Sequence, residues 1–230
     1  LVTGGTRGIG AAIAARLLAD GAAVTVTGTA PDGRGPEGCA YLAADFADPD
    51  AAAAFAGRVA GMGFDILVNN AGINKVAPFA EIDPADFARI QQVNVTAPFL
   101  LARAVVPGMR ERGWGRIVTV SSIWGRISRA GRGAYSASKF AVTALSEALR
   151  MELEPFGVGV SILYPGLTRS RMAEAQMADL PADRAMLVPQ QAVMRTPTGD
   201  AVALVVSPEG VVEQRVLRTA RAIGTNWLVT

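Results

Sequence analysis

The stretch LVTGGTRGIGAAIAARLLADGAAVTVTG, residues 1–28, decides the fold of this chain. Residues 1–3 predict a short buried strand, and a glycine-rich loop follows it directly. Ile9, Ile13 and Leu17 recur at intervals of four, which predicts a helix with one apolar face, and Gly21 is a suitable stop for it. Residues 23–27 are rich in Val and Thr and predict a second strand.

The alternation of strands and helices continues along the chain. Helices are expected over residues 50–61, over 84–112 with interruptions near Pro98 and Pro107, and over 135–153. Strands are expected over 66–68, 116–120 and 158–163. This order predicts an α/β fold with a doubly wound, Rossmann-like parallel sheet. Ligands bind beyond the carboxyl ends of such strands, so the polar clusters that follow them should converge on one crevice.

The composition limits the chemistry. The chain has no histidine, which excludes Ser-His-Asp and Cys-His catalysis and every histidine-ligated metal site, and no metal is expected. The formal net charge of +2 is too small to indicate nucleic acid or an anionic membrane as partner. The single cysteine, Cys39, allows no internal disulfide and fits a reducing compartment, so a cytoplasmic location is expected.

Neither end of the sequence shows a targeting segment. No apolar run approaches the roughly 18 residues that span a bilayer, and no signal peptide precedes the first motif. The chain opens at Leu1, without methionine and inside an expected strand. We therefore expect a clipped start, with a removed targeting segment as the alternative.

The glycine loop predicts a phosphate site. Gly4 permits the tight turn, Gly8 lets the backbone approach a pyrophosphate, and Gly10 allows close packing of helix on strand. A pyrophosphate would then lie at the helix N-terminus. The alternative is a plain turn, because the spacing is Thr-Gly-x-x-x-Gly-x-Gly and not Gly-x-Gly-x-x-Gly.

Two further motifs give the loop a family context. With Asn69-Asn70-Ala71-Gly72 and Tyr135-Ser136-Ala137-Ser138-Lys139, it resembles the short-chain dehydrogenase/reductase family over about residues 1–186. The resemblance implies an oxidoreductase that transfers hydride between NADP(H) and a small-molecule carbonyl/alcohol pair. It also implies a homodimer or homotetramer.

Four residues carry the expected catalysis. Tyr135 and Lys139 are four apart on a helix and so share one face, where an ammonium would lower the tyrosine pKa of about 10. The resemblance makes Tyr135 the general acid or base and lets Lys139 hold the nicotinamide ribose. It makes Ser122 the hydrogen-bonding partner of the substrate oxygen, with Ser121 as the lesser candidate. Asn94 would support a water-linked proton relay, and a structural asparagine in a kinked helix is the alternative.

The resemblance also implies the cofactor contacts. Residues 70–72 would line the adenine ribose, Asp45 and Phe46 the adenine, and Pro165-Gly166 the nicotinamide side, where either Thr168 or Ser170 would meet the carboxamide. The expected contacts are Gly4, Thr6, Arg7, Gly8, Ile9, Gly10, Thr29, Asp45, Phe46, Asn70, Ala71, Gly72, Tyr135, Lys139, Pro165, Gly166 and Thr168.

Charge indicates which nicotinamide cofactor is used. NAD-specific sites place a carboxylate at the end of the second strand, and here that position is Gly28, with no acid before Asp32. Arg7 in the glycine loop can face a 2′-phosphate, which favours NADP over NAD; a solvated loop charge is the alternative. Arg126, Arg129 and Arg132 lie between Ser122 and Tyr135. They favour an acidic substrate, unless they form only a solvated face.

The last 44 residues fit the family poorly. One interpretation is a helix over 200–206 and a strand over 211–217. The other is a hairpin, because Val-rich runs at 201–206 and 211–219 flank Ser207-Pro208-Glu209-Gly210. In that interpretation residues 187–230 resemble the membrane-proximal β region of periplasmic adaptor subunits of tripartite efflux pumps. We therefore expect two domains, 1–186 and 187–230, and a non-catalytic dinucleotide-binding or assembly protein is the alternative function.

Overall fold

The structure, a computed structural model, describes residues 1–166, 186–189, 193–195, 200–206, 212–217, 219–223 and 226–229. The chain divides into two compact units, Leu1–Met177 and Ala178–Thr230. Each unit has its own strands, and they are described separately below.

A parallel sheet forms the centre of the first unit. Its strands are β1 (Thr25–Gly28), β2 (Ala40–Ala43), β3 (Ile66–Asn69), β4 (Gly115–Val120) and β5 (Val158–Leu163). β1 pairs with β2, and β3, β4 and β5 pair in that order, all in parallel. Val2 bridges both Val26 and Val68, so residues 1–3 join the two groups of strands. The Rossmann-like fold is confirmed.

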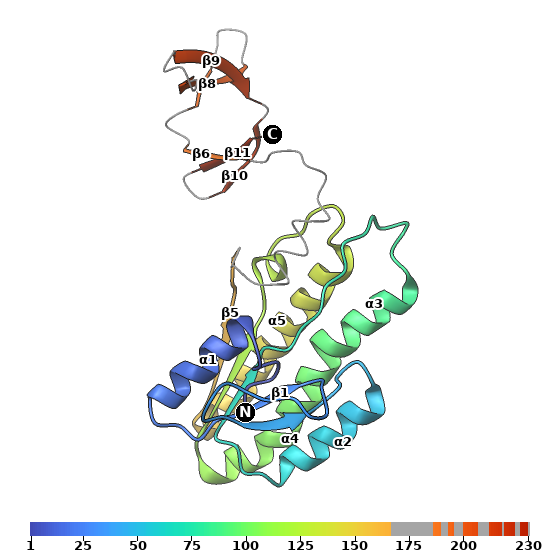
Figure 1. Ribbon diagram of the computed structural model, residues 1–230. Helices are drawn as coiled ribbons and strands as arrows, with labels where there is room; N and C mark the ends of the chain where they lie inside the picture. Colours follow the sequence, from blue (N-terminus) through green and yellow to red (C-terminus); the bar gives the residue numbers. More distant parts are fainter. Residues whose placement is uncertain are drawn as a thin grey trace. The chain divides into compact units, whose positions relative to one another are not determined.

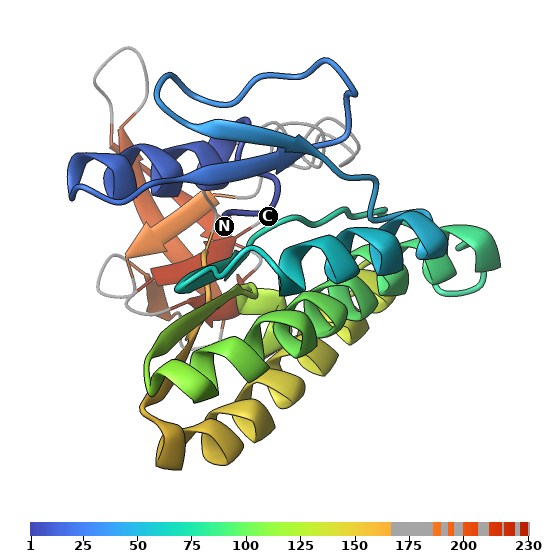
Figure 2. The same cartoon turned by 90° about the horizontal axis from the view of Figure 1, so that it is seen from below.

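Helices cover both faces of this sheet. They are α1 (Gly8–Ala19), α2 (Pro49–Ala60), α3 (Pro84–Gln91), α4 (Ala97–Arg112) and α5 (Gly133–Leu153). Figures 1 and 2 show α1 on one face and α2, α4 and α5 on the other. Successive strand residues alternate between the faces: Leu67 packs in the α2–α4–α5 core, and Val68 packs with Val2 against α1.

The long helical segment differs from expectation at one of its two prolines. Near Pro98 the α-helix does give way, to a π-helix at Gln92–Thr96 between α3 and α4. The expected interruption near Pro107 was wrong, because α4 continues to Arg112 and ends at Gly113, whose φ is 66°. The helix survives the proline because Val105 and Met109 on either side of it are buried in the core.

The second unit is built from antiparallel strands. They are β6 (Met186–Pro189), β7 (Met194–Arg195), β8 (Ala201–Val206), β9 (Val212–Leu217), β10 (Thr219–Ile223) and β11 (Asn226–Val229). β8 and β9 pair from Ala201–Leu217 to Val206–Val212 (Figure 1), which is a hairpin. This finding decides between the two interpretations of the tail, and the expected helix over 200–206 was wrong.

Candidate active site

The glycine loop leaves the N-terminus of α1 open. Gly4 and Gly8 have φ angles of 61° and 57°, a region that favours glycine. Arg7 precedes the helix with an extended backbone and provides no side-chain cap, and nothing lies within 4 Å of the place a Cβ on Gly8 would occupy. The N–H groups of the first turn are therefore available to an anion.

The loop is tied to the end of β3. Thr3 Oγ1 accepts hydrogen bonds from the backbone N–H groups of Asn70 (2.9 Å) and Ala71 (3.0 Å). Asn70 Nδ2 donates to the backbone oxygens of Thr3 (2.9 Å) and Gly4 (3.1 Å). A Cβ on Gly10 would overlap Gly4 O and Asn70 Nδ2, so close packing requires glycine there. The first two motifs thus form one surface.

The structure brings the four expected catalytic residues together. Tyr135 and Lys139 lie on α5, Ser122 follows β4, and Asn94 lies in the π-helix. The Ser122 hydroxyl is close enough to Tyr135 to lower its pKa, and Lys139 Nζ lies 5.7 Å from the Tyr135 ring centroid. A Cβ on Gly72 would lie 3.4 Å from Asn94 Oδ1 and 3.6 Å from Lys139 Nζ. The third motif therefore meets the second at this point.

Both the oxygen and the nitrogen of the Asn94 side-chain amide make hydrogen bonds to neighbouring segments. Its Oδ1 accepts from Ile73 N and its Nδ2 donates to Ile73 O, both at 2.9 Å, and Nδ2 also donates to Ser138 Oγ at 3.0 Å. The side chain thus fixes the segment after Gly72 against α5. Its role in a proton relay stays a prediction.

Ser121 has a structural role. Its Oγ donates to Lys139 O at 3.2 Å and lies 3.0 Å from Thr143 Oγ1, inside the interface of β4 and α5. Ser122 Oγ instead accepts from Trp124 N at 3.2 Å, at the start of a 3-10 turn. Of the two serines, Ser122 is the one that acts on the Tyr135 pKa.

Burial shifts the titration of the site. It raises the pKa of Tyr135, although the hydrogen bond from Ser122 and the charge of Arg132 oppose that rise. Burial also lowers the pKa of Lys139 to about 8. The Lys139 ammonium donates to Val120 O at 2.9 Å. The Tyr135 pKa is thus raised on balance, because desolvation of the phenolate is the largest effect, whereas the sequence predicted a lowering by Lys139.

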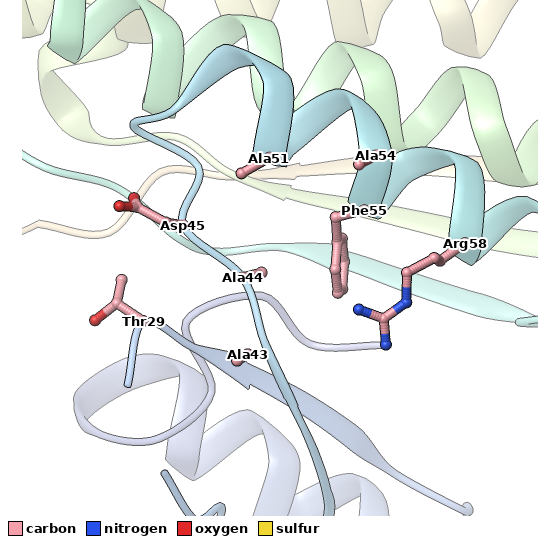
Figure 3. A pocket seen from close by; sticks show the side chains of 8 residues that line it. All are labelled: Thr29, Ala43, Ala44, Asp45, Ala51, Ala54, Phe55 and Arg58. Carbon is pink, nitrogen blue, oxygen red and sulfur yellow. The ribbon is translucent and has the colours of Figure 1, made fainter. Parts of the chain in front are cut away.

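A hollow lies at the ends of β1 and β2. It has a volume of about 230 Å³ and is lined by Thr29, Ala43, Ala44, Asp45, Ala51, Ala54, Phe55 and Arg58. Figure 3 shows Thr29 and Asp45 at one end of it and the Arg58 guanidinium beside Phe55 at the other. Phe46 points elsewhere: it is buried, with its ring 5.6 Å from that of Phe55.

Sequence reasoning missed the α2 side of this hollow. Ala51, Ala54, Phe55 and Arg58 recur at spacings of three and four, which places them on one helix face. That spacing was a usable signal. It was not decisive, because the fold alone determines which face of α2 borders the strand ends.

The end of β1 carries Gly28 in place of the carboxylate of an NAD-specific site, and a larger side chain would crowd its neighbours. A Cβ on Gly28 would lie 2.9 Å from Thr6 Cγ2 and 3.0 Å from Tyr41 Oη. Arg7 is exposed in the loop nearby. On the opposite side, Pro165 O accepts from Ile123 N at 3.1 Å, which brings the Pro165-Gly166 turn beside Ser122. Thr168 and Ser170 lie outside the described residues.

The described part of the chain contains no helix long and apolar enough to cross a membrane. It also contains no group of three or more acidic or cysteine side chains placed to hold a metal ion.

Comparison with known proteins covers both units. Residues 184–230 match the family described as RND MFPs, C-terminal permuted SH3 domain. An acetoacetyl-CoA reductase of Shinella zoogloeoides is 35% identical over 90% of this chain and 88% of its own length. A 3-alpha-(or 20-beta)-hydroxysteroid dehydrogenase of Mycobacterium bovis is 36% identical over 76% of this chain and 70% of its own.

A solved structure agrees with these relatives. It is a putative NAD(P) dependent gluconate 5-dehydrogenase from Beutenbergia cavernae with bound NADP. It is 36% identical and superposes with a TM-score of 0.72 over 77% of this chain and 75% of the other. Residues 1–181 match the family described as short chain dehydrogenase. The chain therefore belongs to the short-chain dehydrogenase/reductase family of oxidoreductases.

Proposed function

We propose that the chain is an NADP(H)-dependent oxidoreductase that interconverts a carbonyl and an alcohol, with Ser122, Tyr135 and Lys139 as its catalytic residues. The observation that carries this proposal is the grouping of Tyr135 and the buried Lys139 on α5 with Ser122 at the end of β4. In this proposal a carbonyl oxygen would accept from both the Tyr135 and the Ser122 hydroxyl. The Lys139 ammonium also lies close to Gly72 and Asn94.

The proposed mechanism assigns a proton to Tyr135. In reduction its hydroxyl donates a proton to the developing alkoxide while Ser122 orients the oxygen, and in oxidation the phenolate takes the proton back. The raised pKa of Tyr135 keeps the phenol protonated near neutral pH, which suits the donor role. The nicotinamide cofactor supplies or accepts the hydride.

The chain offers a place for each part of that cofactor. The open N-terminus of α1 suits the pyrophosphate, and the hollow with Thr29 and Asp45 suits the adenosine end. In this proposal Lys139 donates to the nicotinamide ribose. NADP is favoured because Gly28 offers no carboxylate and Arg7 in the glycine loop is exposed. The Beutenbergia relative holds NADP in its crystal structure.

Replacing Tyr135 tests the mechanism. In Tyr135→Phe, kcat for carbonyl reduction should fall by about 10²- to 10⁴-fold, the usual contribution of a general acid. The dissociation constant for NADPH, measured by tryptophan fluorescence, should stay within about twofold of wild type, since NADPH does not depend on that hydroxyl for its charge contacts. A fully active variant would overturn the mechanism. A wild type that binds NADPH but turns over no carbonyl would favour the non-catalytic alternative.

Replacing Arg7 tests the cofactor preference. The wild type should bind NADPH more tightly than NADH, and Arg7→Ser should weaken NADPH by about 10- to 100-fold, the loss of one charge-assisted hydrogen bond. NADH binding should hardly change. Arg16→Ser is the matched control, since Arg16 is exposed on the same helix and pairs with Asp20. Equal weakening of both cofactors by Arg7→Ser would refute the 2′-phosphate role.

We also propose that the protein is a cytoplasmic homodimer or homotetramer. Phe99 on α4 and Phe140 and Met151 on α5 are 48%, 45% and 66% exposed, which is unusual for such large apolar side chains. A second copy of the chain would cover them.

A further inference from the structure

The structure separates the three arginines that precede Tyr135. Arg126 lies over the Tyr164 ring at 4.4 Å, and Arg129 is exposed. Arg132 is only 5% exposed. A solvated face therefore accounts for Arg129 but not for Arg132.

The buried guanidinium of Arg132 is not fully satisfied. Its Nη1 is buried and has no hydrogen-bond partner. In the part of the chain that the structure describes, acidic side chains pair with Arg16, Arg112 and Arg215, and none pairs with Arg132. Burying an unpaired charge costs several kcal/mol, so a bound anion is the natural compensation.

The position of Arg132 places it beside the proposed reaction centre. It directly precedes α5, three residues before Tyr135, and Ser136 N donates to its backbone oxygen at 2.8 Å. The segment after β3 meets this loop next to Arg132, because Ala77 N donates to Gly131 O at 3.1 Å. The charge of Arg132 lowers the pKa of Tyr135 against the effect of burial, so the two groups are close enough to interact.

Two more unsatisfied polar groups lie at the same edge of the sheet. Asn74, after β3, has a buried amide with no partner for either Oδ1 or Nδ2, and Tyr164, after β5, has a buried hydroxyl with none. Buried polar groups are normally hydrogen-bonded, and such exceptions call for an explanation. A polar ligand at the ends of β3, β4 and β5 would explain all three.

We propose that Arg132 binds a carboxylate of the substrate, so that the chain acts on short oxo acids and the corresponding hydroxy acids. This inference rests on the proposed function. A guanidinium matches a carboxylate with two parallel hydrogen bonds, while a neutral carbonyl compound would leave the charge buried and unpaired. Ser122 and Tyr135 hold the carbonyl at one end of the substrate, and Arg132 holds its carboxylate at the other.

Paired substrates test this assignment on the full chain. The probes are 2-oxo and 3-oxo acids of four to six carbons, each with its methyl ester, which keeps the carbonyl and removes the charge. In Arg132→Gln, KM for the preferred acid should rise by about 10- to 100-fold, as expected for one lost charge-assisted contact, and KM for its ester should change less than about threefold. Arg132→Lys should give an intermediate KM. Arg129→Gln removes an exposed charge from the same loop and should change neither.

A binding measurement separates this inference from the proposed function. The hydroxy acid is titrated into the complex of enzyme and NADP in the Tyr135→Phe background, where no turnover interferes. Loss of binding on adding Arg132→Gln supports the carboxylate site even if no reaction is found. Reduction of neutral carbonyls without any preference for acids would overturn the inference and leave the function standing.

One further outcome would also overturn it. If Arg132→Gln lowers kcat equally for acid and ester and moves the pH profile upward, Arg132 acts only on the Tyr135 pKa. If Arg132→Gln leaves KM and kcat unchanged for all substrates, groups of the chain itself balance the charge of the guanidinium.

Discussion

Lys139 is the most constrained ionisable residue of the site. It is 5% exposed, and its ammonium donates to Val120 O at 2.9 Å. No carboxylate pairs with it among the described residues. A carbonyl dipole compensates a buried charge only in part, and the pKa of Lys139 accordingly falls to about 8. The buried charge of Lys139 therefore destabilises the fold while it places a positive charge beside Tyr135.

That cost should be visible as a pH dependence of stability. Below pH 8 Lys139 is protonated both in the folded and in the unfolded chain, and the full cost is present. Between about 8 and 10.5 the folded chain releases the proton that the unfolded chain retains, so stability rises with pH. We predict that Lys139→Met has a larger free energy of unfolding than wild type at pH 8. This difference between the two proteins should become smaller by on the order of 3 kcal/mol as the pH rises to 10.5.

Denaturant unfolding at several pH values, followed by fluorescence, measures the difference. Lys75→Met, which removes an exposed lysine, is the control. A constant difference between Lys139→Met and wild type across the window would show that Lys139 does not titrate there.

At the scale of elements, regular patterns could be predicted and irregular ones could not. The periodicity of Ile9, Ile13 and Leu17 gave α1 correctly, because one apolar face is enough to define a helix. β2 was missed: Ala-Tyr-Leu-Ala has no β-branched residue and is a strand only because β1 pairs with it. The π-helix around Asn94 was foreseen only as an interruption of the helical pattern.

The same holds for the site: the positions of its residues could be predicted, whereas properties that depend on packing could not. Tyr135, Ser122 and Gly72 could be placed together because each follows a strand or begins a helix at the same edge of the sheet. The direction of the Tyr135 pKa shift could not be predicted, since it depends on burial contributed by several elements. Phe46 illustrates the same limit: its neighbour Asp45 lines the hollow, while its own ring packs against Phe55.

At the scale of the whole molecule, two sequence families share one chain. The family matches cover residues 1–181 and 184–230, and the compact units divide between Met177 and Ala178. The first unit is built on a parallel sheet with two apolar cores, and the second on antiparallel strands. We propose that the two are separate domains, as the sequence boundary at residue 186 predicts, and that each is stabilised by its own core.

Disrupting the second unit tests whether the first depends on it. Val202 on β8 is 3% exposed, so Val202→Asp buries a charge and should destabilise that unit by several kcal/mol. Calorimetry should then show loss of one transition, while NADPH affinity and turnover stay within about twofold of wild type, the change expected when no contact of the site is altered. Val212→Asp on β9 is the control, because Val212 is 60% exposed. If Val202→Asp abolishes NADPH binding and Val212→Asp does not, the dinucleotide site requires the second unit, and the family boundary does not mark a boundary of folding.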